Sequence, residues 1–444
     1  MTCEGPGDGA FFACAAGAPP GREPLALSFD DFIRTSSDPR HRAGVERLWQ
    51  RCAEAGDLYR KHYEGLYCVG CEQFYTPEDL VDGRCRDHGT EPQLVSEENW
   101  FFRLSRHAGA LRELITTGRL CIEPAARRNE VLALIDSGLH DFSVSRSQHR
   151  ARGWGIPVPG DPDQVVYVWW DALGNYVTGL GYGTADATFD QWWTGSGQRV
   201  HLAGKGVLRF HAVYWPAMLL SAGLPLPTDI LVHDYLTVDG RKISKSSGTT
   251  VDPADLVADV GTDAVRWWLL RDVPRVGDAD FTRDRLVARA DSDLAGGFGN
   301  LVNRVVTMVH RYRDGRPPTP TRGTAPGCED LARACADSPR AVEAALTDFD
   351  FRRAAAAVWT VVEEANRCID ATRPWESAKA ERAGDRAAGE RLEDVLGALL
   401  RACLHLADRL TPFLPGAASR IARQCTPVGG VLPPPMPLFP RLGD

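Results

Sequence analysis

The chain has 444 residues, of which 43% are hydrophobic and 25% are charged, and its net charge is −8. At roughly 100–200 residues per domain, this length predicts two to four domains. The chain contains no run of about 18 apolar residues, which argues against a membrane-spanning helix. Its acidic balance does not decide for or against a nucleic-acid partner, because a local basic groove sets phosphate affinity.

The first segment, residues 1–27, is rich in Gly, Ala and Pro and shows no periodicity. Its positive charge is too low for a secretory signal, so we predict a disordered leader and a cytoplasmic location. In that compartment the twelve cysteines are expected to be reduced or bound to metal rather than paired in disulfides.

The part of the chain up to about residue 255 alternates helical and strand patterns. Helical spacing covers 40–56 and, interrupted by Gly118 and Pro124, 100–136, whereas 64–95 is turn-rich. Three strands and one long apolar helix follow in the order Val165–Trp169, Val200–Ala203, the helix Leu208–Ser221, and Asp229–His233. A strand, glycine turn, helix and strand in this order predict a parallel α/β fold.

From about Asp255 onward we expect amphipathic helices and no strands. The expected helices are 262–271, 283–312, 328–346, 349–371, 386–409 and 414–424. A proline-rich loop fills 312–327, and the proline-rich tail after Thr426 is expected to dock as extended chain. The C-terminal third is therefore predicted to be a helical bundle.

A pair of short cysteine motifs predicts one structural zinc ion. Cys68-x-x-Cys71 is followed by Cys85-x-x-His88, and two such pairs joined by a loop suit tetrahedral Zn²⁺. His88 is the weakest of the four ligand assignments. Five other cysteines stand alone in helical patterns and are expected to fill the core: Cys121, Cys328, Cys335, Cys368 and Cys403.

Only five of the 51 basic residues are lysines, and three of them lie in two glycine-flanked segments. Lys205 follows a predicted strand within Gly204-Lys205-Gly206, at the strand end where ligands bind in open α/β sheets. Lys242 and Lys245 lie in a loop that could close over the phosphates of a nucleotide. Because lysine supplies a compact charge that arginine does not mimic, these three are candidate functional residues.

The motif Lys242-Ile243-Ser244-Lys245-Ser246 is similar to the KMSKS motif of class I aminoacyl-tRNA synthetases. Four further segments resemble the methionyl-tRNA synthetase family: Tyr67–Cys71, Glu98–Phe102, Val168–Ala172 and Phe210–Ala217. Asn366 followed by Pro374-Trp375 adds to this resemblance, which covers roughly residues 28–424.

The resemblance implies ATP-dependent activation of methionine and its transfer to tRNA(Met), with magnesium accompanying ATP. It implies that Lys245 and Lys242 are catalytic and that Lys242, Ser244, Lys245, Gly204 and Lys205 bind ATP. The implied methionine pocket comprises Trp169, Ala172, Leu173, Tyr176, Val207, His211 and Trp215. The implied anticodon-binding residues are Asn300, Arg304 and Trp375.

The expected fold class is α/β: an incomplete Rossmann-like catalytic domain with an inserted zinc-knuckle connective domain, followed by an all-α anticodon-binding bundle. The expected divisions are a leader (1–27), a catalytic remnant with the zinc knuckle (28–145), the second catalytic half (146–255), a stem-contact helical region (256–295) and the anticodon-binding domain (296–444). A monomer is the weak expectation.

Two departures from the family pattern bear on activity. The chain contains no His-x-Gly-His motif, so the first half of the nucleotide fold is expected to be missing, and a misassigned start is the simplest cause. Gly206 also stands where the family has Asp. The chain is interpreted as a methionine–tRNA ligase homologue whose activity is in question. A non-catalytic tRNA-binding remnant and an amino-acid-activating paralogue in small-molecule biosynthesis remain as alternatives.

Loss of strands from a parallel sheet would leave an apolar face and an unpaired edge exposed. We therefore expect weak stability or aggregation, unless a partner covers that edge.

Overall fold

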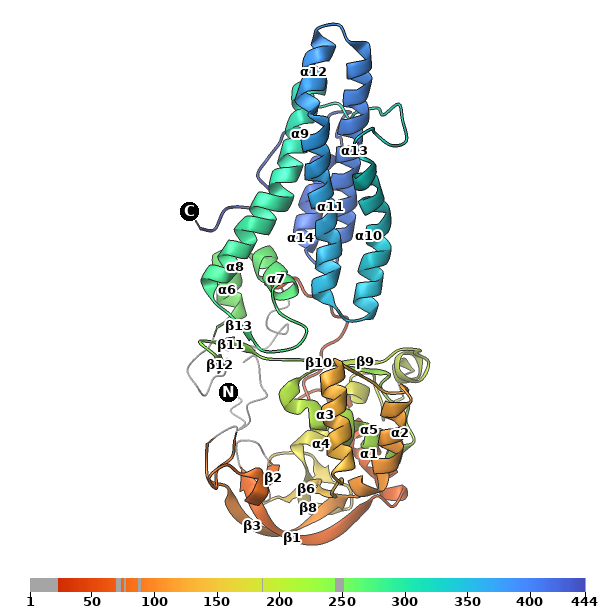
Figure 1. Cartoon of the computed structure of the whole chain (residues 1–444). Helices are drawn as coiled ribbons and strands as arrows, with labels where there is room; N and C mark the ends of the chain where they lie inside the picture. Colours follow the sequence, from red (N-terminus) through yellow and green to blue (C-terminus); the bar gives the residue numbers. More distant parts are fainter. Residues whose placement is uncertain are drawn as a thin grey trace. The chain divides into compact units, whose positions relative to one another are not determined.

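The computed structural model describes residues 23–68, 73–75, 77–86, 89–185, 187–243 and 251–443. The chain forms two compact units. The first, called the α/β unit, is built mainly from Ser28–Tyr235 (Figure 1). The second, called the helical unit, is built mainly from residues 236–243 and 251–443, and residues 23–27 also belong to it. No helix among these residues combines the length and apolarity that a bilayer crossing requires.

A three-stranded parallel sheet organises the α/β unit. Its order is β4 (Cys121–Glu123), β10 (Asp229–His233) and β9 (Val200–Gly204), with β10 in the centre. The bounds of β10 agree with the predicted strand, and β9 extends one residue beyond its prediction. The strand β4 was not predicted, because its three residues are too short to show a period.

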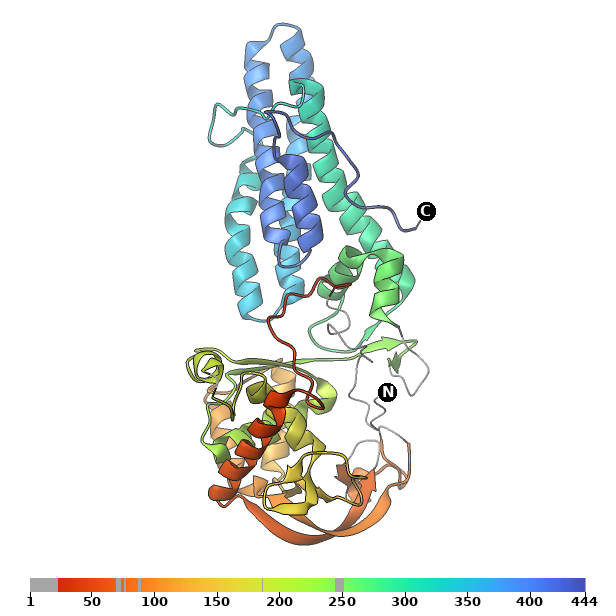
Figure 2. The same cartoon turned by 180° about the vertical axis from the view of Figure 1, so that it is seen from behind.

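Among the described residues, helices cover one face of this sheet, and its opposite face is covered only in part. His201, Ala203, Ile230 and Val232 point into the core, whereas Leu202 on the opposite face is 60% exposed. Helices α3, α4 and α5 lie on one side of β9 and β10 in both views (Figures 1 and 2). Within the described residues β9 pairs with β10 alone, so its other edge is open. Leu231, which pairs with Leu202 and points to the same face, is 7% exposed, so that face is exposed at Leu202 rather than along its whole width.

The helices of this unit pack around a shared core. Their bounds are α1 Pro39–Glu54, α2 Ala108–Thr116, α3 Ala125–Asp136, α4 Val168–Thr178 and α5 Trp215–Ala222. Short turns are η1 Pro77–Asp79, η2 Leu104–His107, η3 Asp190–Thr194, η4 Lys205–Val207 and η5 Phe210–Tyr214.

A buried polar contact joins α1 to α4. The ring of His41 contacts Thr178 Oγ1 at 2.8 Å through Nδ1, and Asp171 through Nε2. His41 and Thr178 are completely buried, so this contact fixes the relative position of the two helices rather than facing a ligand. Asp38 caps the start of α1 by accepting a hydrogen bond from the Arg40 amide.

A long antiparallel strand pair flanks the segment predicted to be turn-rich over 64–95. That prediction was wrong at its two ends, 64–68 and 93–95, which are strand, whereas the described residues among 77–92 form turns and short bridges. The strands β1 (Leu58–Cys68) and β3 (Gln93–Phe102) pair over ten residues, from Leu58 opposite Phe102 to Tyr67 opposite Gln93. The sheet is completed by β2 (Gln73–Tyr75) and β5 (Phe142–Ser143). The mixed polar sequence of β1 hid its strand character.

A third sheet contains β6 (Ser145–Ser147), β8 (Asp161–Val166) and β7 (Pro157–Val158). The strand predicted at Val165–Trp169 ends at Val166, and the two tryptophans that follow begin α4. That boundary was wrong because an apolar run of this length fits a buried helix start as well as a strand.

The helical unit contains the predicted bundle. Its helices are α6 Pro253–Val260, α7 Thr262–Arg271, α8 Arg283–Arg289, the π-helical η6 Ala290–Gly299, α9 Asn300–Arg313, α10 Glu329–Thr347, α11 Phe351–Thr372, α12 Pro374–Arg382, α13 Arg386–Leu410 and α14 Pro415–Cys425. The helix α12 was not predicted as an element. Asp350 and Asp385 cap α11 and α13 through backbone amides three residues later.

A small sheet also belongs to the helical unit, so the prediction that strands vanish after Asp255 was wrong. It comprises β12 (Arg241–Lys242), β11 (Leu236–Val238) and β13 (Ala279–Asp280). Thr237 donates to the carboxylate of Asp280 at 2.8 Å.

The first and last described segments both pack on the helical unit. Arg266 of α7 donates to the carbonyls of Leu25 at 2.8 Å and Phe413 at 2.7 Å. The predicted leader therefore has defined contacts from about residue 24. The extended tail after Thr426 buries Leu432, Leu438 and Phe439, which confirms its predicted docking.

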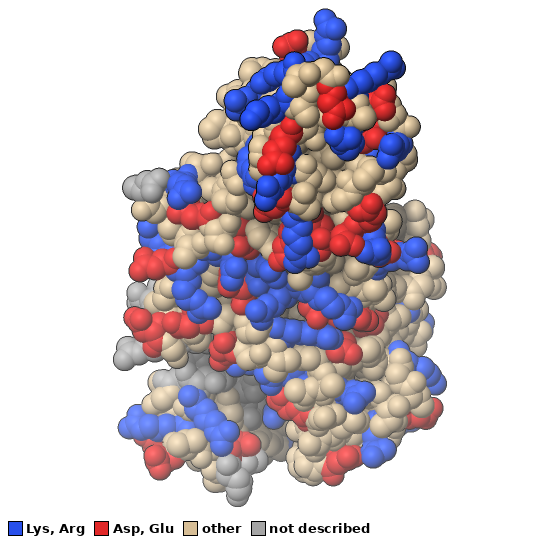
Figure 3. Space-filling model, turned by 45° about the horizontal axis from the view of Figure 1, so that its top comes forward, with Lys and Arg blue, Asp and Glu red and all other residues tan. Residues whose placement is uncertain are grey.

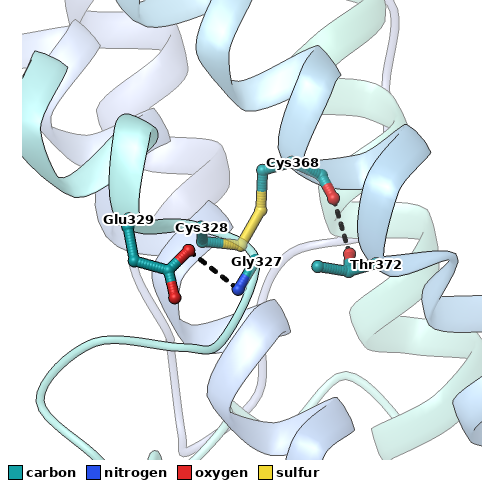
Figure 4. Close-up of a disulfide and its surroundings, with 5 residues drawn as sticks. All are labelled: Gly327, Cys328, Glu329, Cys368 and Thr372. Carbon is teal, nitrogen blue, oxygen red and sulfur yellow. Dashed lines mark hydrogen bonds between the residues drawn. A yellow bond between two sulfur atoms is a disulfide. The ribbon is translucent and has the colours of Figure 1, made fainter.

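A disulfide joins Cys328, which precedes α10, to Cys368 of α11 (Figure 4). Both residues are 2% exposed. Their predicted place in the core is confirmed, but the prediction that they are reduced was wrong, because two thiols 40 residues apart gave no sequence signal for pairing. Cys403 is buried as predicted, Cys335 is only half-buried, and Cys121 lies in β4 rather than in a helix.

Candidate functional site

The carboxyl ends of the three parallel strands bring charged residues to one edge of the sheet. Lys205 directly follows β9, Asp234 directly follows β10, and Arg127 lies in the first turn of α3 after β4. In open α/β sheets this edge is where ligands bind. The structure thus places Gly204 and Lys205 at the edge where the sequence argument put them.

Two described neighbours, Asp234 and Tyr235, contact Lys205 at this edge. Its Nζ lies 3.8 Å from Asp234 Oδ1 and 4.8 Å from the centroid of the Tyr235 ring. Arg127 contacts the same oxygen of Asp234, whose side chain is only 3% exposed. Hydrogen bonds to Glu130 and Asp234 raise the pKa of Arg127 above its usual value. Two cations, Arg127 and Lys205, therefore contact the one buried carboxylate of Asp234.

An aromatic and polar cluster joins α4 to the segment that follows Lys205 in the chain. Tyr176 Oη on α4 is 2.8 Å from Nε2 of His211, and His211 Nδ1 is 3.0 Å from the Val207 carbonyl. Burial raises the pKa of Tyr176 to about 12 and lowers the pKa of His211. Both side chains are therefore neutral at pH 7, and the ring nitrogen contacting the carbonyl carries the proton.

A second histidine completes the cluster. His201 on β9 accepts a hydrogen bond from Trp215 Nε1 at 3.1 Å, and its ring lies 3.9 Å from that of Tyr176. Burial lowers the pKa of His201 to about 3, with the neighbouring His211 adding to the effect. A neutral imidazole can accept the indole proton, so His201 fixes the orientation of Trp215.

The seven residues predicted to form an amino-acid pocket lie on α4 and on the segment from Val207 to Trp215. Tyr176, Val207, His211 and Trp215 contact one another directly or through one neighbour. Trp169 stacks on Phe210 at a centroid distance of 4.1 Å. Ala172 is half-buried on α4, whereas Leu173 is 2% exposed and Trp215 completely buried, so these last two contribute to the core.

The second lysine segment is described only in part. Lys242 ends the strand β12 of the helical unit. Ser244 and Lys245 lie outside the described residues.

Half of the predicted metal-ligand set is described. Cys68 and Cys85 are buried, and both lie beside Thr90: Cys68 Sγ is 3.8 Å from its hydroxyl, and the Cys85 amide donates to its carbonyl at 2.9 Å. Cys71 and His88 lie outside the described residues. Among the residues that the structure does describe, no group of three metal-ligating side chains is found.

The predicted base-reading residues lie in the helical unit. Asn300 is the exposed first residue of α9, and Arg304, one turn later, donates to Asn366 Oδ1 of α11 at 3.1 Å. Trp375, at the start of α12, is 44% exposed. Figure 3 brings the end of the bundle that carries α12 forward and shows Lys and Arg side chains there with acidic side chains among them.

Four residues of the site were not predicted: Arg127, His201, Asp234 and Tyr235. Asp234 could have been found, because it follows a correctly predicted strand just as Lys205 does. Arg127 could not, since β4 was missed. His201 lies within a strand, and no sequence signal distinguishes it from a core residue.

A family model described as class I tRNA synthetases (M) matches residues 22–85 and 71–306. The methionine–tRNA ligase of Caldanaerobacter subterraneus is 41% identical over 401 residues, covering 90% of this chain and 61% of the relative. The methionine–tRNA ligase of a Nostoc species is 40% identical over 406 residues, covering 90% and 74% respectively.

Solved structures agree with these relatives. Methionyl-tRNA synthetase of Mycobacterium tuberculosis bound by methionyl-adenylate superposes with a TM-score of 0.86 at 36% identity, covering 94% of this chain and 84% of that one. The chain spans about three fifths of the length of the first curated relatives that it matches.

Proposed function

Because the chain belongs to the methionine–tRNA ligase family of class I tRNA synthetases, we propose that it activates methionine with ATP and transfers it to a methionine tRNA. The observation that carries this proposal is the neutral cluster of Tyr176, His211 and Val207 immediately after Lys205. An uncharged aromatic site suits a thioether, and a cation at the adjoining strand end suits a phosphate or carboxylate.

The proposed reaction has two steps. A carboxylate oxygen of methionine attacks the α-phosphorus of ATP, the bond to the bridging oxygen breaks, and pyrophosphate leaves with that electron pair. A ribose hydroxyl at the tRNA terminus then attacks the activated carbonyl, and AMP leaves. No covalent bond to the protein forms, so its contribution is positioning and charge stabilisation.

Each candidate residue has a role in this scheme. Lys205 is assigned to the nucleotide at the sheet edge, and Lys242 and Lys245, with Ser244 beside them, to the charge that develops on the phosphates. Magnesium is expected to accompany ATP. Trp169, Ala172, Tyr176 and the segment around His211 are assigned to methionine.

ATP–pyrophosphate exchange that depends on methionine tests this function on the full chain. Exchange that is lost in Lys245→Ala supports the proposal, with Lys379→Ala as a control for removing a lysine from the helical unit. Absence of exchange, together with tRNA binding that depends on the anticodon, would replace it with a non-catalytic tRNA-binding function.

The helical unit is proposed to bind the anticodon through Asn300, Arg304 and Trp375. An amide and a guanidinium one helical turn apart can bond the edges of unstacked bases, and an exposed indole can stack on one. The partial exposure of Trp375 supports this assignment.

We also propose one structural zinc ion, held by Cys68, Cys71, Cys85 and His88. The burial of Cys68 and Cys85 around the same residue, Thr90, fits a knuckle that closes on a metal. Metal analysis of the purified chain should find one zinc per chain, and Cys85→Ser should lower that content. Cys121→Ser, which removes a thiol outside the knuckle, should leave the zinc content unchanged.

A further inference from the structure

The edge of the sheet around Lys205 contains an arrangement that the proposed activity does not itself require. Three consecutive parallel strands each deliver one charged residue there: Arg127 after β4, Asp234 after β10 and Lys205 after β9. Asp234 lies between the two cations and contacts both. Its side chain is 3% exposed, whereas that of Lys205 is 26% exposed and reaches solvent.

Tyr235, next in the chain, approaches Lys205 from a second direction. The Lys205 ammonium lies 4.8 Å from the centroid of the Tyr235 ring, within the range of a cation–π interaction. An ammonium group on a four-carbon stem is otherwise flexible. Two contacts from adjacent residues restrict it to one region of the sheet edge.

Gly206 makes this approach possible. A Cβ atom at position 206 would overlap the hydroxyl oxygen of Tyr235 and lie 3.3 Å from its Cζ. The Tyr235 hydroxyl thus occupies the space that a side chain at position 206 would need. Any residue larger than glycine would displace the ring against which Lys205 packs.

We propose that Asp234 and Tyr235 are positioning residues for Lys205, and that Gly206 is required to admit the Tyr235 ring beside it. In this arrangement the ammonium is ordered before an anionic ligand arrives, so binding does not have to pay that ordering cost again. Asp234 is itself held by Arg127, which anchors the group to the neighbouring strand. The proposal rests on the proposed function only for the identity of the ligand, ATP.

The position of Lys205 can be measured without a ligand. Reductive ¹³C-methylation of the full chain labels five lysines and the N-terminal amine, and single Lys→Arg variants assign the lysine signals. The Lys205 methyl signal should be shifted upfield of the Lys379 signal by the Tyr235 ring. This shift should vanish in Tyr235→Leu, persist in Tyr235→Phe and decrease in Asp234→Asn. A Lys205 signal that coincides with that of Lys379 and ignores these substitutions would overturn the proposal.

Binding of ATP by calorimetry then measures the functional effect. Lys205→Ala should weaken ATP binding about tenfold, the loss expected for one charge-assisted hydrogen bond. Asp234→Asn should weaken it about threefold when Lys205 is present, and should not weaken it in the Lys205→Ala background. The control is Asp229→Asn, the same change at the opposite end of β10, which should leave binding unchanged.

The outcomes separate the two claims. If Asp234→Asn tightens ATP binding in both backgrounds, the carboxylate only repels phosphate and the positioning role is wrong. If Lys205→Ala leaves ATP binding unchanged, or the chain binds no ATP, the proposed function loses its ATP assignment, and the Lys205 signal still decides positioning.

The contact between Gly206 and Tyr235 has a suppressor test. Gly206→Ala should lower the melting temperature and remove the shift of the Lys205 signal. Adding Tyr235→Phe deletes the overlapping oxygen and should restore both. If the double variant is as impaired as Gly206→Ala, the close approach of Tyr235 is not the reason for glycine at this position.

Discussion

The guanidinium of Arg304 on α9 donates to the side-chain oxygen of Asn366 on α11 at 3.1 Å. Asn366 in turn donates to the carbonyl of Val362 at 3.0 Å, so its amide is oriented by its own helix. Asp370, one turn further along α11, lies 3.9 Å from the same guanidinium. The direction of Arg304, which is assigned to base recognition, is therefore set from the neighbouring helix.

Replacing Asn366 with Ala should weaken tRNA binding even if Asn366 itself touches no base. Loss of one hydrogen bond to a charged group allows Arg304 to move, and a loss of about three- to tenfold in affinity is expected. Filter binding with methionine tRNA checks this, with a tRNA of altered anticodon as the reference. Arg311→Gln, on the exposed side of α9, should lower affinity equally for both tRNAs. An unchanged affinity in Asn366→Ala would contradict the positioning role of this amide.

The buried His201 should make the α/β unit less stable in acid. Because burial holds the folded-state pKa at about 3, the unfolded chain binds a proton near pH 6.5 that the folded chain does not. The contribution of His201 to the free energy of unfolding should therefore be fully present above about pH 6.5. As the pH falls below that value it should decrease by about 1.4 kcal/mol per pH unit, until the pH approaches the folded pKa.

His201→Gln isolates this effect, because an amide oxygen can still accept the hydrogen bond from Trp215 but does not titrate. We expect the variant to be less stable than the parent at pH 7.5, with the difference in melting temperature shrinking steadily toward pH 5. A difference that stays constant across this range would show that His201 does not control the acid response.

Reduction of the Cys328–Cys368 disulfide should destabilise the helical unit. Its closed loop spans 40 residues, for which loss of the cross-link costs about 4 kcal/mol in the chain-entropy model. For a unit of this size the melting temperature should fall by about 10 °C. Calorimetry with and without a phosphine reductant measures the change. The double variant Cys328→Ala/Cys368→Ala should melt at the lower temperature and ignore the reductant, whereas Cys335→Ala should still respond to it.

The exposed Leu202 on the edge strand β9 should promote self-association. Leu202 is 60% exposed on a strand with an open edge among the described residues, a combination that favours edge-to-edge pairing. Leu202→Lys should reduce the concentration dependence of light scattering while changing the free energy of unfolding by less than about 0.5 kcal/mol. Val428→Lys, at a residue that is 74% exposed in the tail, should have no effect on scattering. A parent chain that stays monodisperse at high concentration would exclude this role for Leu202.

The sequence predicts this structure well where one period dominates. The helices α7, α10, α11, α13 and α14 lie within two residues of their predicted bounds, because each shows an apolar stripe at helical spacing. The central strand β10 was predicted for a similar reason, since its apolar run is bounded by turn residues. The strand β9, predicted in the same way, places Lys205, whereas Tyr176 of the aromatic cluster lies on α4, whose start was predicted as a strand.

The remaining elements depend on partners that are distant in the chain. The long strands β1 and β3 carry polar and aromatic residues without a clean alternation, and they become strands because they pair with each other over ten positions. The contacts of Lys205 with Asp234 and Tyr235 join residues about 30 positions apart, which spacing alone does not reveal. The disulfide is a third case of the same kind.

The position of Arg266 has a consequence for synthesis on the ribosome. Its guanidinium binds the carbonyl of Leu25, made 241 residues earlier, and the carbonyls of Pro412 and Phe413, made about 146 residues later. The α/β unit lies between Leu25 and α7 in the sequence. While this unit emerges from the ribosome, the segment around Leu25 therefore cannot yet make its contact with Arg266. Since domains fold as their residues become available, the α/β unit can fold first, before the segment around Leu25 has bound to α7. Closure of the helical unit around Arg266 is then among the last events in the maturation of the chain.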